Sequence, residues 1–444
     1  MDRHRATPQS CVMDGQEAQP APRDATGALA ALRRACWLTP ARARAYGVIL
    51  AAGMASVAVV WLFLSHGALD ARGKPIGADF AHYWTAGRLA LQGSPAAAWD
   101  VSALHAGQVA IFGAGIGVTP FLYPPPFLVI CVILALLPYG WSLIAWLSVT
   151  GAAYWIALRR HLPPRVSALP ILAFPAGFVN ATHGQNGFLT AALFGAAALA
   201  YRRSPMLAGV CLGLLSFKPH LGIAVIVVLL AGRRWRTVFA ASLTVLSLYC
   251  ASLLLVGAEA WLAFLEAASI ARSILEQRLI DPEKLASVFG AVLLMGGGPM
   301  LGYAVQGIAA VATCVVAARI ACKRPGGAGE VSLMVAAVPL CSPYLFDYDL
   351  TILALPLAWV FASAQRDGFL AWEKIGLLAA FLVPLLARPI GGAIGVPITP
   401  FVAAGLLIVV ARRLYMRGQN FDCAQSCATE RGQPLCSPSR SSIT

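Results

Sequence analysis

The chain has 444 residues, of which 59% are hydrophobic and only 12% are charged. Soluble domains carry about 25% charged residues, so this composition excludes an array of soluble domains. Apolar runs long enough to cross a hydrocarbon core of about 30 Å recur along the sequence. The chain is therefore predicted to be an all-α polytopic membrane protein.

The net charge is +14, and short basic clusters lie between apolar runs at residues 201–203, 232–236, 322–324 and 412–417. Such clusters mark cytoplasmic loops, so the charge indicates topology and no nucleic-acid partner is expected. We expect a multi-pass protein of the inner (plasma) membrane. Residues 1–44 and 416–444 are predicted to be cytoplasmic and disordered, and residues 45–415 to form the membrane-embedded domain.

The first predicted span covers residues 46–65 and follows arginines, which places the N-terminus in the cytoplasm and the next loop outside. That loop runs to Tyr123 and is long enough to suggest a function. Residues 77–93, "GADFAHYWTAGRLALQG", lie within it. We expect a short helix lying in the interface, with its aromatic side chains at headgroup depth.

About eleven to thirteen spans are predicted in all, because many apolar segments follow this loop. The segments 126–138 and 166–182 are short, and an odd number of crossings must separate Tyr123 from residues 201–203. One of the two is therefore expected to be re-entrant or fused with its neighbour, and residues 286–297 raise the same question. The other segments are 141–158, 187–200, 205–217, 220–231, 237–256, 300–321, 331–343, 348–364, 371–387 and 398–411.

Carboxylates are scarce: there is no Asp or Glu between Asp100 and Glu259. Ionisable groups at membrane depth are costly and usually functional. Asp79, just past the first span, is either a solvated loop residue or a base held at the membrane face. Asp347 and Asp349 are either solvated caps of the following helix or part of a site.

Three polar islands interrupt the apolar runs: residues 180–188 ("NATHGQNGF"), 216–222 ("SFKPHLG") and 342–349 ("SPYLFDYD"). Under simple alternation each lies one crossing from a cytoplasmic cluster, on the same external side as the first loop. Each could be an ordinary loop. Their amide and aromatic groups, beside short spans, instead suggest broken helices that converge on one site.

These motifs, in this order and together with "YPPPF" at residues 123–127 and "GRRWR" at 232–236, resemble bacterial glycosyltransferase family 87. The resemblance spans roughly residues 46–415. It implies a GT-C-type helical bundle that takes sugars from polyprenyl phosphates at the external face, and by carry-over Asp79 as the catalytic base. It also implies a lipid or glycan acceptor and membrane lipids as partners.

The residues suit this chemistry, because displacement at an anomeric carbon needs a carboxylate to take the acceptor proton. The departing phosphate needs cationic groups, for which the candidates are Lys218, His220, Arg272 and Arg278. The candidates for binding the sugar or acceptor are Tyr83, Trp84, Tyr123, His183, Gln185, Asn186, Tyr344, Asp347 and Asp349. No cofactor is expected, and the need for a metal stays open.

The family's mannose-transferring members often carry histidine where this chain has Asp347, Tyr348 and Asp349. The expected sugar is therefore a mannose-like hexose or a pentose. A transporter or lipid-linked sugar flippase is the main alternative, since secondary transporters also build sites from broken helices. An inactive relative that acts as a scaffold is a further one.

Overall fold

The computed structural model describes residues 25–323 and 326–430, and all regular elements within them are helical. This confirms the predicted all-α class. The α-helices are α1 (Ala25–Arg34), α2 (Pro40–Phe63), α3 (Ala78–Leu91), α4 (Val101–Phe112), α5 (Pro125–Leu134), α6 (Tyr139–Arg159), α7 (Leu169–Leu172), α8 (Pro175–His183), α9 (Gly187–Ala200), α10 (Pro205–Gly213), α11 (Gly222–Ala231), α12 (Trp235–Glu276), α13 (Val288–Leu294), α14 (Pro299–Cys322), α15 (Ala328–Cys341), α16 (Ala354–Asp367), α17 (Glu373–Ile394) and α18 (Ile398–Glu430). Short 3₁₀ helices are η1 (Pro95–Ala98), η2 (Leu214–Phe217), η3 (Pro219–Leu221), η4 (Pro282–Lys284) and η5 (Asp347–Leu353).

Seven helices in the described part of the chain are long and apolar enough to cross a membrane. They are α2, α6, α12, α14, the continuous η5–α16 unit, α17 and the first part of α18. Shorter apolar helices, including α5, α9, α10, α11 and α15, lie between them. The chain is thus a multi-pass membrane protein.

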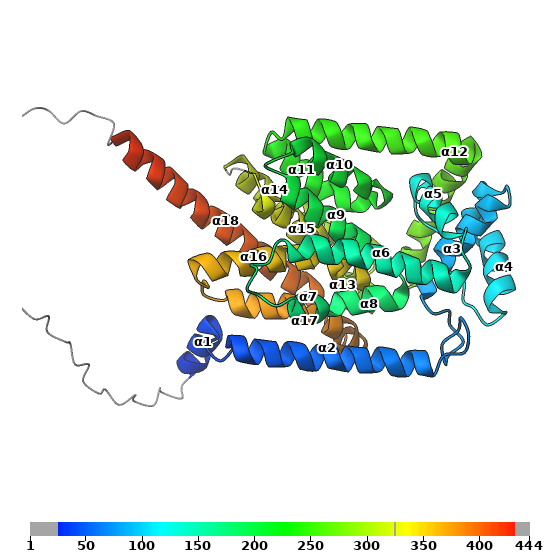
Figure 1. Cartoon of the computed structure of the whole chain (residues 1–444), viewed down its shortest axis with the longest axis horizontal. Coiled ribbons are helices and arrows are strands. Elements are labelled where there is room, and N and C mark those ends of the chain that lie inside the picture. Colours follow the sequence, from blue (N-terminus) through cyan, green and yellow to red (C-terminus); the bar gives the residue numbers. More distant parts are fainter. Residues whose placement is uncertain (1–24, 324–325, 431–444) are drawn as a thin grey trace, which may run out of the picture.

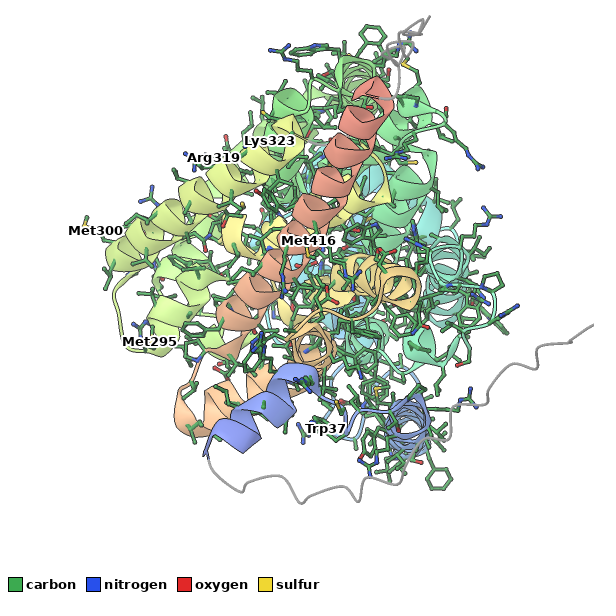
Figure 2. All side chains as sticks on the ribbon, turned by 90° about the vertical axis from the view of Figure 1, so that its left-hand side faces the viewer. Trp37, Met295, Met300, Arg319, Lys323 and Met416 are labelled. Carbon is green, nitrogen blue, oxygen red and sulfur yellow. The ribbon has the colours of Figure 1, made fainter. Side chains whose placement is uncertain are left out.

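Helix α2 stands at the edge of the molecule. It begins at Pro40, after Thr39, whose hydroxyl accepts a hydrogen bond from the Arg42 backbone N–H at 3.3 Å, as at other helix starts. Most of its apolar side chains are exposed. Figure 2 shows α2 almost along its axis at one side, with Met300 of α14 on the opposite flank. These surfaces suit contact with lipid tails.

The centre of the bundle is α15, in which every residue from Gly329 to Cys341 is buried. Apart from Glu330 and Ser332 its side chains are apolar on every face, as expected for a helix with no lipid or solvent face. The η5–α16 unit that follows it is also largely buried. The two elements form one core with side chains from α6, α9, α10, α11 and α18.

The three segments of uncertain topology contain only short helices, of which α13 lies in residues 286–297, and their re-entrant or fused arrangement stays a prediction. Helix α5 has 10 residues, and the region 166–182 contains only the 4-residue α7 and the 9-residue α8. Helices α10 and α11 are separated by η2 and η3, with Lys218 between them in a non-helical conformation (φ −125°, ψ 73°). Pro219 follows it, and a residue before proline is disfavoured in the α region.

The first loop is largely helical and, with the second half of α12, forms the end of the molecule opposite α1 (Figure 1). Helix α12 bends at Gly257, whose φ of +82° favours glycine. At the other end, within the segment predicted to be disordered, α1 forms and the Trp372 N–H donates to the Arg33 carbonyl at 2.8 Å. Helix α18 continues to Glu430; residues 1–24 and 431–444 lie outside the described residues.

Candidate active site

Asp79 lies in the first turn of α3 and is partly buried. A carboxylate there is favoured by the positive end of the helix dipole. Gly77 enters the helix with φ +70°, and the Tyr139 hydroxyl of α6 donates to the carbonyls of Ile76 at 2.5 Å and Gly77 at 3.2 Å. The start of α3, and with it Asp79, is therefore fixed to α6.

The turn between α8 and α9, residues 184–186, packs directly on this first turn of α3. Gly184 ends α8 with φ +67°, and a Cβ added there would lie 2.6 Å from Cβ of Phe80. The Trp146 indole N–H holds the Gly184 carbonyl at 3.1 Å. Only glycine fits both the backbone conformation and the close approach, so the turn brings Gln185 beside Asp79.

Gln185 is the centre of a buried polar network. Its Nε2 donates to Oδ2 of Asp79 at 3.0 Å, and its Oε1 accepts from the hydroxyls of Tyr83 at 2.5 Å and Tyr123 at 3.2 Å. The two tyrosine hydroxyls are 2.8 Å apart, and Nδ2 of Asn186 donates to the Tyr83 hydroxyl at 3.2 Å. Three separate chain segments thus meet at one carboxylate.

Aromatic rings enclose this network. Tyr83 packs edge-on against Tyr123 at 5.2 Å between centroids and Phe127 at 4.9 Å, and His82 stacks on Tyr123 at 6.4 Å. Burial raises the pKa of Tyr83 and of Tyr123, so both hydroxyls keep their protons and can donate. Burial also lowers the pKa of His82 to about 4, so its imidazole is neutral at physiological pH.

The aromatic side chains of α3 face protein, and the depth of this helix in the membrane stays a prediction. Residues 78–91 do form a helix, but Phe80 to Gly87 are buried in protein, and Tyr83 is 0% exposed. Its hydroxyl needs a partner once buried, and Gln185 and Asn186 supply it. An aromatic amphipathic pattern suits both a lipid interface and a protein interior, so the sequence alone did not separate them.

A buried ion pair lies beside the network. Lys218 Nζ contacts Oδ1 of Asp349, both side chains are 3% exposed, and the ammonium is 5.5 Å from the centre of the Tyr348 ring. Oδ2 of Asp349 accepts the Phe346 backbone N–H at 3.1 Å, so Asp349 also caps the start of η5. His220 is partly buried, and its Nε2 has no hydrogen-bond partner among the described residues.

The turn 184–186 connects the Asp79 network to η5. The Gly187 N–H donates to Asn180 Oδ1 at 2.7 Å, and a Cβ on Gly187 would lie 2.9 Å from the Tyr348 carbonyl oxygen. The His183 ring is 6.0 Å from the Tyr348 ring. The charge of Asp79 interacts electrostatically with Lys218 and with Asp347, which is 7% exposed. The polar islands therefore form one cluster.

Four candidate residues make their contacts outside this cluster. Trp84 donates from its indole N–H to the Leu137 carbonyl at 2.9 Å and packs under Arg88. Tyr344 packs on a separate small core with Leu275, Leu285 and Phe289. Arg272 is exposed and pairs with Glu276 at 2.6 Å, and Arg278 donates to the Gly297 carbonyl at 2.8 Å. Their assigned roles stay predictions.

Sequence reasoning missed Arg388 of α17. It is exposed, and its charge interacts with Asp347 and Asp281. Its end of α17 packs on η4, where a Cβ on Gly391 would lie 3.1 Å from Cβ of Glu283. A signal was available, because Arg388 is the only charged residue between Lys374 and Arg412. Charge inside so long an apolar run indicates function.

Two cavities lie outside this cluster. An apolar one of about 130 Å³ is enclosed by α6, α7, α16 and α17, and an open one of about 620 Å³ lies between α2 and residues 70–72 of the first loop. Neither contains a candidate site residue, so we base the site on the hydrogen-bond network. Among the described residues, no group of three or more His, Cys, Asp or Glu side chains is arranged to hold a metal ion.

Searches of curated proteins and of solved structures returned no match. A family model described as Glycosyltransferase family 87 matches residues 121–343, slightly more than half of the chain. The matched region contains Tyr123, Gln185, Asn186 and Lys218, and it leaves out Asp79. The all-helical membrane fold and the buried polar cluster agree with this match. The chain belongs to glycosyltransferase family 87.

Proposed function

We propose that the protein moves a hexose or pentose from a polyprenyl-phosphate sugar to a lipid or glycan acceptor at the external face of the inner membrane. Asp79 acts as the general base. The acceptor hydroxyl oxygen forms a bond to the anomeric carbon as its proton passes to Asp79. The bond from that carbon to the phosphate oxygen breaks, and polyprenyl phosphate leaves with the electron pair.

One observation carries the choice of base. Asp79 is a partly buried carboxylate with one oxygen held by Gln185, and it sits among polar groups from three distant chain segments. Asp70 and Asp100, the other acids of the first loop, bond instead to groups close to them in sequence, and for Asp70 these include the Trp61 indole N–H at 3.4 Å. Asp70 accepts from the N–H groups of Arg72 and Lys74, and Asp100 caps α4.

The developing charge on the phosphate needs cations. Lys218 stays our candidate from the sequence, and its pairing with Asp349 means that the phosphate has to displace or share that partner. Arg388 is exposed and forms no ion pair within the described residues 25–323 and 326–430. A guanidinium can bind phosphate through two parallel hydrogen bonds. We therefore add Arg388 as a second phosphate ligand, beside the carboxylate of Asp347.

The sugar-binding surface contains the remaining polar groups of the cluster. Oδ1 of Asn186 is buried without a hydrogen-bond partner, so it can accept from a sugar hydroxyl. His183 directs Nδ1 to the Val179 carbonyl at 2.9 Å, which leaves Nε2 to face a ligand. Tyr348, stacked on Phe346 at 5.4 Å, offers a ring face.

The test uses purified protein in lipid nanodiscs with synthetic polyprenyl-phosphate sugars, one hexose and one pentose, and an envelope lipid extract as acceptor. We expect Asp79→Asn to lower transfer by roughly 10²- to 10⁴-fold, the usual contribution of a general base. Asp70→Asn is the matched control, because Asp70 lies in the same loop and is also partly buried. Full activity of Asp79→Asn refutes the assignment. Solute movement across sealed vesicles without a glycosidic product supports the transporter alternative.

A further inference from the structure

Gln185 was predicted to bind sugar or acceptor, but its carbonyl oxygen is already surrounded by donors. Oε1 is within 3.2 Å of the Tyr123 hydroxyl and of the Asn186 backbone N–H, and within 2.5 Å of the Tyr83 hydroxyl. An amide nitrogen in that position would face the Asn186 backbone N–H, and the amide oxygen would then face the Asp79 carboxylate, so the amide orientation is fixed by its surroundings. Nε2 must then point to Asp79.

Three hydrogen bonds of this network form a continuous chain that ends at Asp79. Asn186 donates through Nδ2 to the Tyr83 oxygen, Tyr83 donates to Oε1 of Gln185, and Gln185 donates through Nε2 to Oδ2 of Asp79. Gln185 and Asn186 are 2% and 0% exposed, so water does not compete for these bonds. A chain of aligned donors inside a protein holds its terminal acceptor firmly.

The two oxygens of Asp79 are therefore not equivalent. Oδ2 is bound by Gln185 at 3.0 Å, whereas Oδ1 accepts no hydrogen bond in the part of the chain that the structure describes. A general base needs one oxygen directed at the proton that it removes. We infer that Gln185 is a positioning residue, which fixes the Asp79 carboxylate through Oδ2 so that Oδ1 meets the acceptor hydroxyl, with Tyr83 in turn fixing the Gln185 amide.

This inference rests on the proposed function, since it assigns to Gln185 a role in the reaction of Asp79. It also differs from the role suggested by the sequence, because the carbonyl oxygen is fully engaged and one N–H of the amide is bound to Asp79, which leaves a single N–H for any other partner. Positioning and sugar binding predict different kinetics. Loss of positioning lowers kcat at unchanged donor and acceptor KM, whereas loss of sugar binding raises KM.

Two variants test the inference by steady-state kinetics over pH 4–9. Gln185→Leu keeps the approximate volume without the amide, and we expect kcat to fall roughly 10²-fold, the effect of a small misplacement of a catalytic group. Gln185→Glu places a second carboxylate beside Asp79. Like charges at this distance disfavour each other, so the acid limb of the pH–rate profile is expected to move to higher pH by one unit or more.

Gln108→Leu is the matched control. Gln108 lies on α4, in the same region of the fold, and is 1% exposed. Its side chain donates to the Thr119 carbonyl at 3.4 Å. The Gln108→Leu variant is expected to have the same pH–rate profile as the parent protein. An unchanged acid limb in Gln185→Glu, or a raised KM with unchanged kcat in Gln185→Leu, overturns the inference even if Gln185→Leu folds poorly.

The experiment separates this inference from the proposed function. If Asp79→Asn is inactive and the Gln185 variants behave like the parent, only the positioning role fails. If Asp79→Asn is active, the base assignment fails. Combining Gln185→Leu with Asp79→Asn adds a check: residues that act as a unit are not additive, so the double variant is expected to be no slower than Asp79→Asn alone.

Discussion

The Lys218–Asp349 pair offers the sharpest test of how the site is held together. Both side chains are 3% exposed, and Asp349 has one further hydrogen bond, from the Phe346 N–H at 3.1 Å. Lys218→Met keeps the length of the side chain and removes its charge. The variant therefore leaves a desolvated carboxylate without its cation.

The size of the effect follows from this burial. Two unit charges 4 Å apart attract by about 4 kcal/mol at an effective dielectric constant of 20. Removing one partner of a buried pair costs about 3–5 kcal/mol, because the remaining charge stays desolvated. We expect Lys218→Met to lower the free energy of unfolding by that amount. Adding Asp349→Asn is expected to restore most of it, since no charge then remains and the amide oxygen can still accept from Phe346.

The assay is reversible unfolding in mixed detergent micelles, followed by circular dichroism. Lys284→Met is the control, because the Lys284–Asp281 pair is 35% and 58% exposed and such pairs contribute about 0–1 kcal/mol. Wild-type stability of Lys218→Met refutes the reasoning. The reasoning is also refuted if the double variant Lys218→Met/Asp349→Asn loses as much free energy of unfolding as the two single variants together. The KM for the sugar donor, measured on Asp349→Asn, then tests the phosphate role of Lys218 separately. Without Asp349 the Lys218 ammonium is free to bind the donor phosphate, so this KM is expected to fall.

Two other predictions follow from the packing around Asp79. Gly184→Ala combines left-handed strain of about 1–2 kcal/mol with a Cβ clash against the first turn of α3. Gly93→Ala has a similar φ of +87° in open space and carries the strain alone. We expect most sugar transfer to be lost in the first and retained in the second, and equal activities would contradict this. His82 has a pKa of about 4 in the folded protein, below its ordinary 6.5, so the unfolded chain binds the proton first. Stability is then expected to be complete above pH 6.5 and to fall by roughly 3 kcal/mol towards pH 4. His82→Phe is expected to remove this part of the pH dependence, and an unchanged dependence in equilibrium unfolding would contradict the assignment.

The fold was largely predictable because a membrane requires long apolar helices. Residues 187–200 and 300–321 were assigned to spans and form α9 and α14 with nearly those limits. The broken helices were recognisable from proline and short length, as at Pro125 and Pro219. The family could be recognised from the order of the polar motifs.

The contacts within the site were not predictable in the same way. Lys218 and Asp349 are 131 positions apart, and no local pattern marks them as partners. Arg272 shows the opposite case: Glu276 follows four residues later, a spacing typical of a surface ion pair on one helix. That local pattern favoured a structural role over phosphate binding, and the structure shows that pair.

The hydrogen-bond chain gives the first loop a role that the family match alone does not. The matched residues 121–343 include Tyr123, Gln185 and Asn186, but the chain of donors ends on Asp79, outside the match. A buried donor without its acceptor costs about 1–3 kcal/mol, so the Gln185 amide requires the carboxylate even before substrate is bound. The matched bundle and the first loop therefore depend on each other for stability at the carboxylate that is proposed to remove the proton, through its other oxygen. Exchanging residues 66–100 for an inert linker is expected to destabilise the turn 184–186 as well as to abolish transfer.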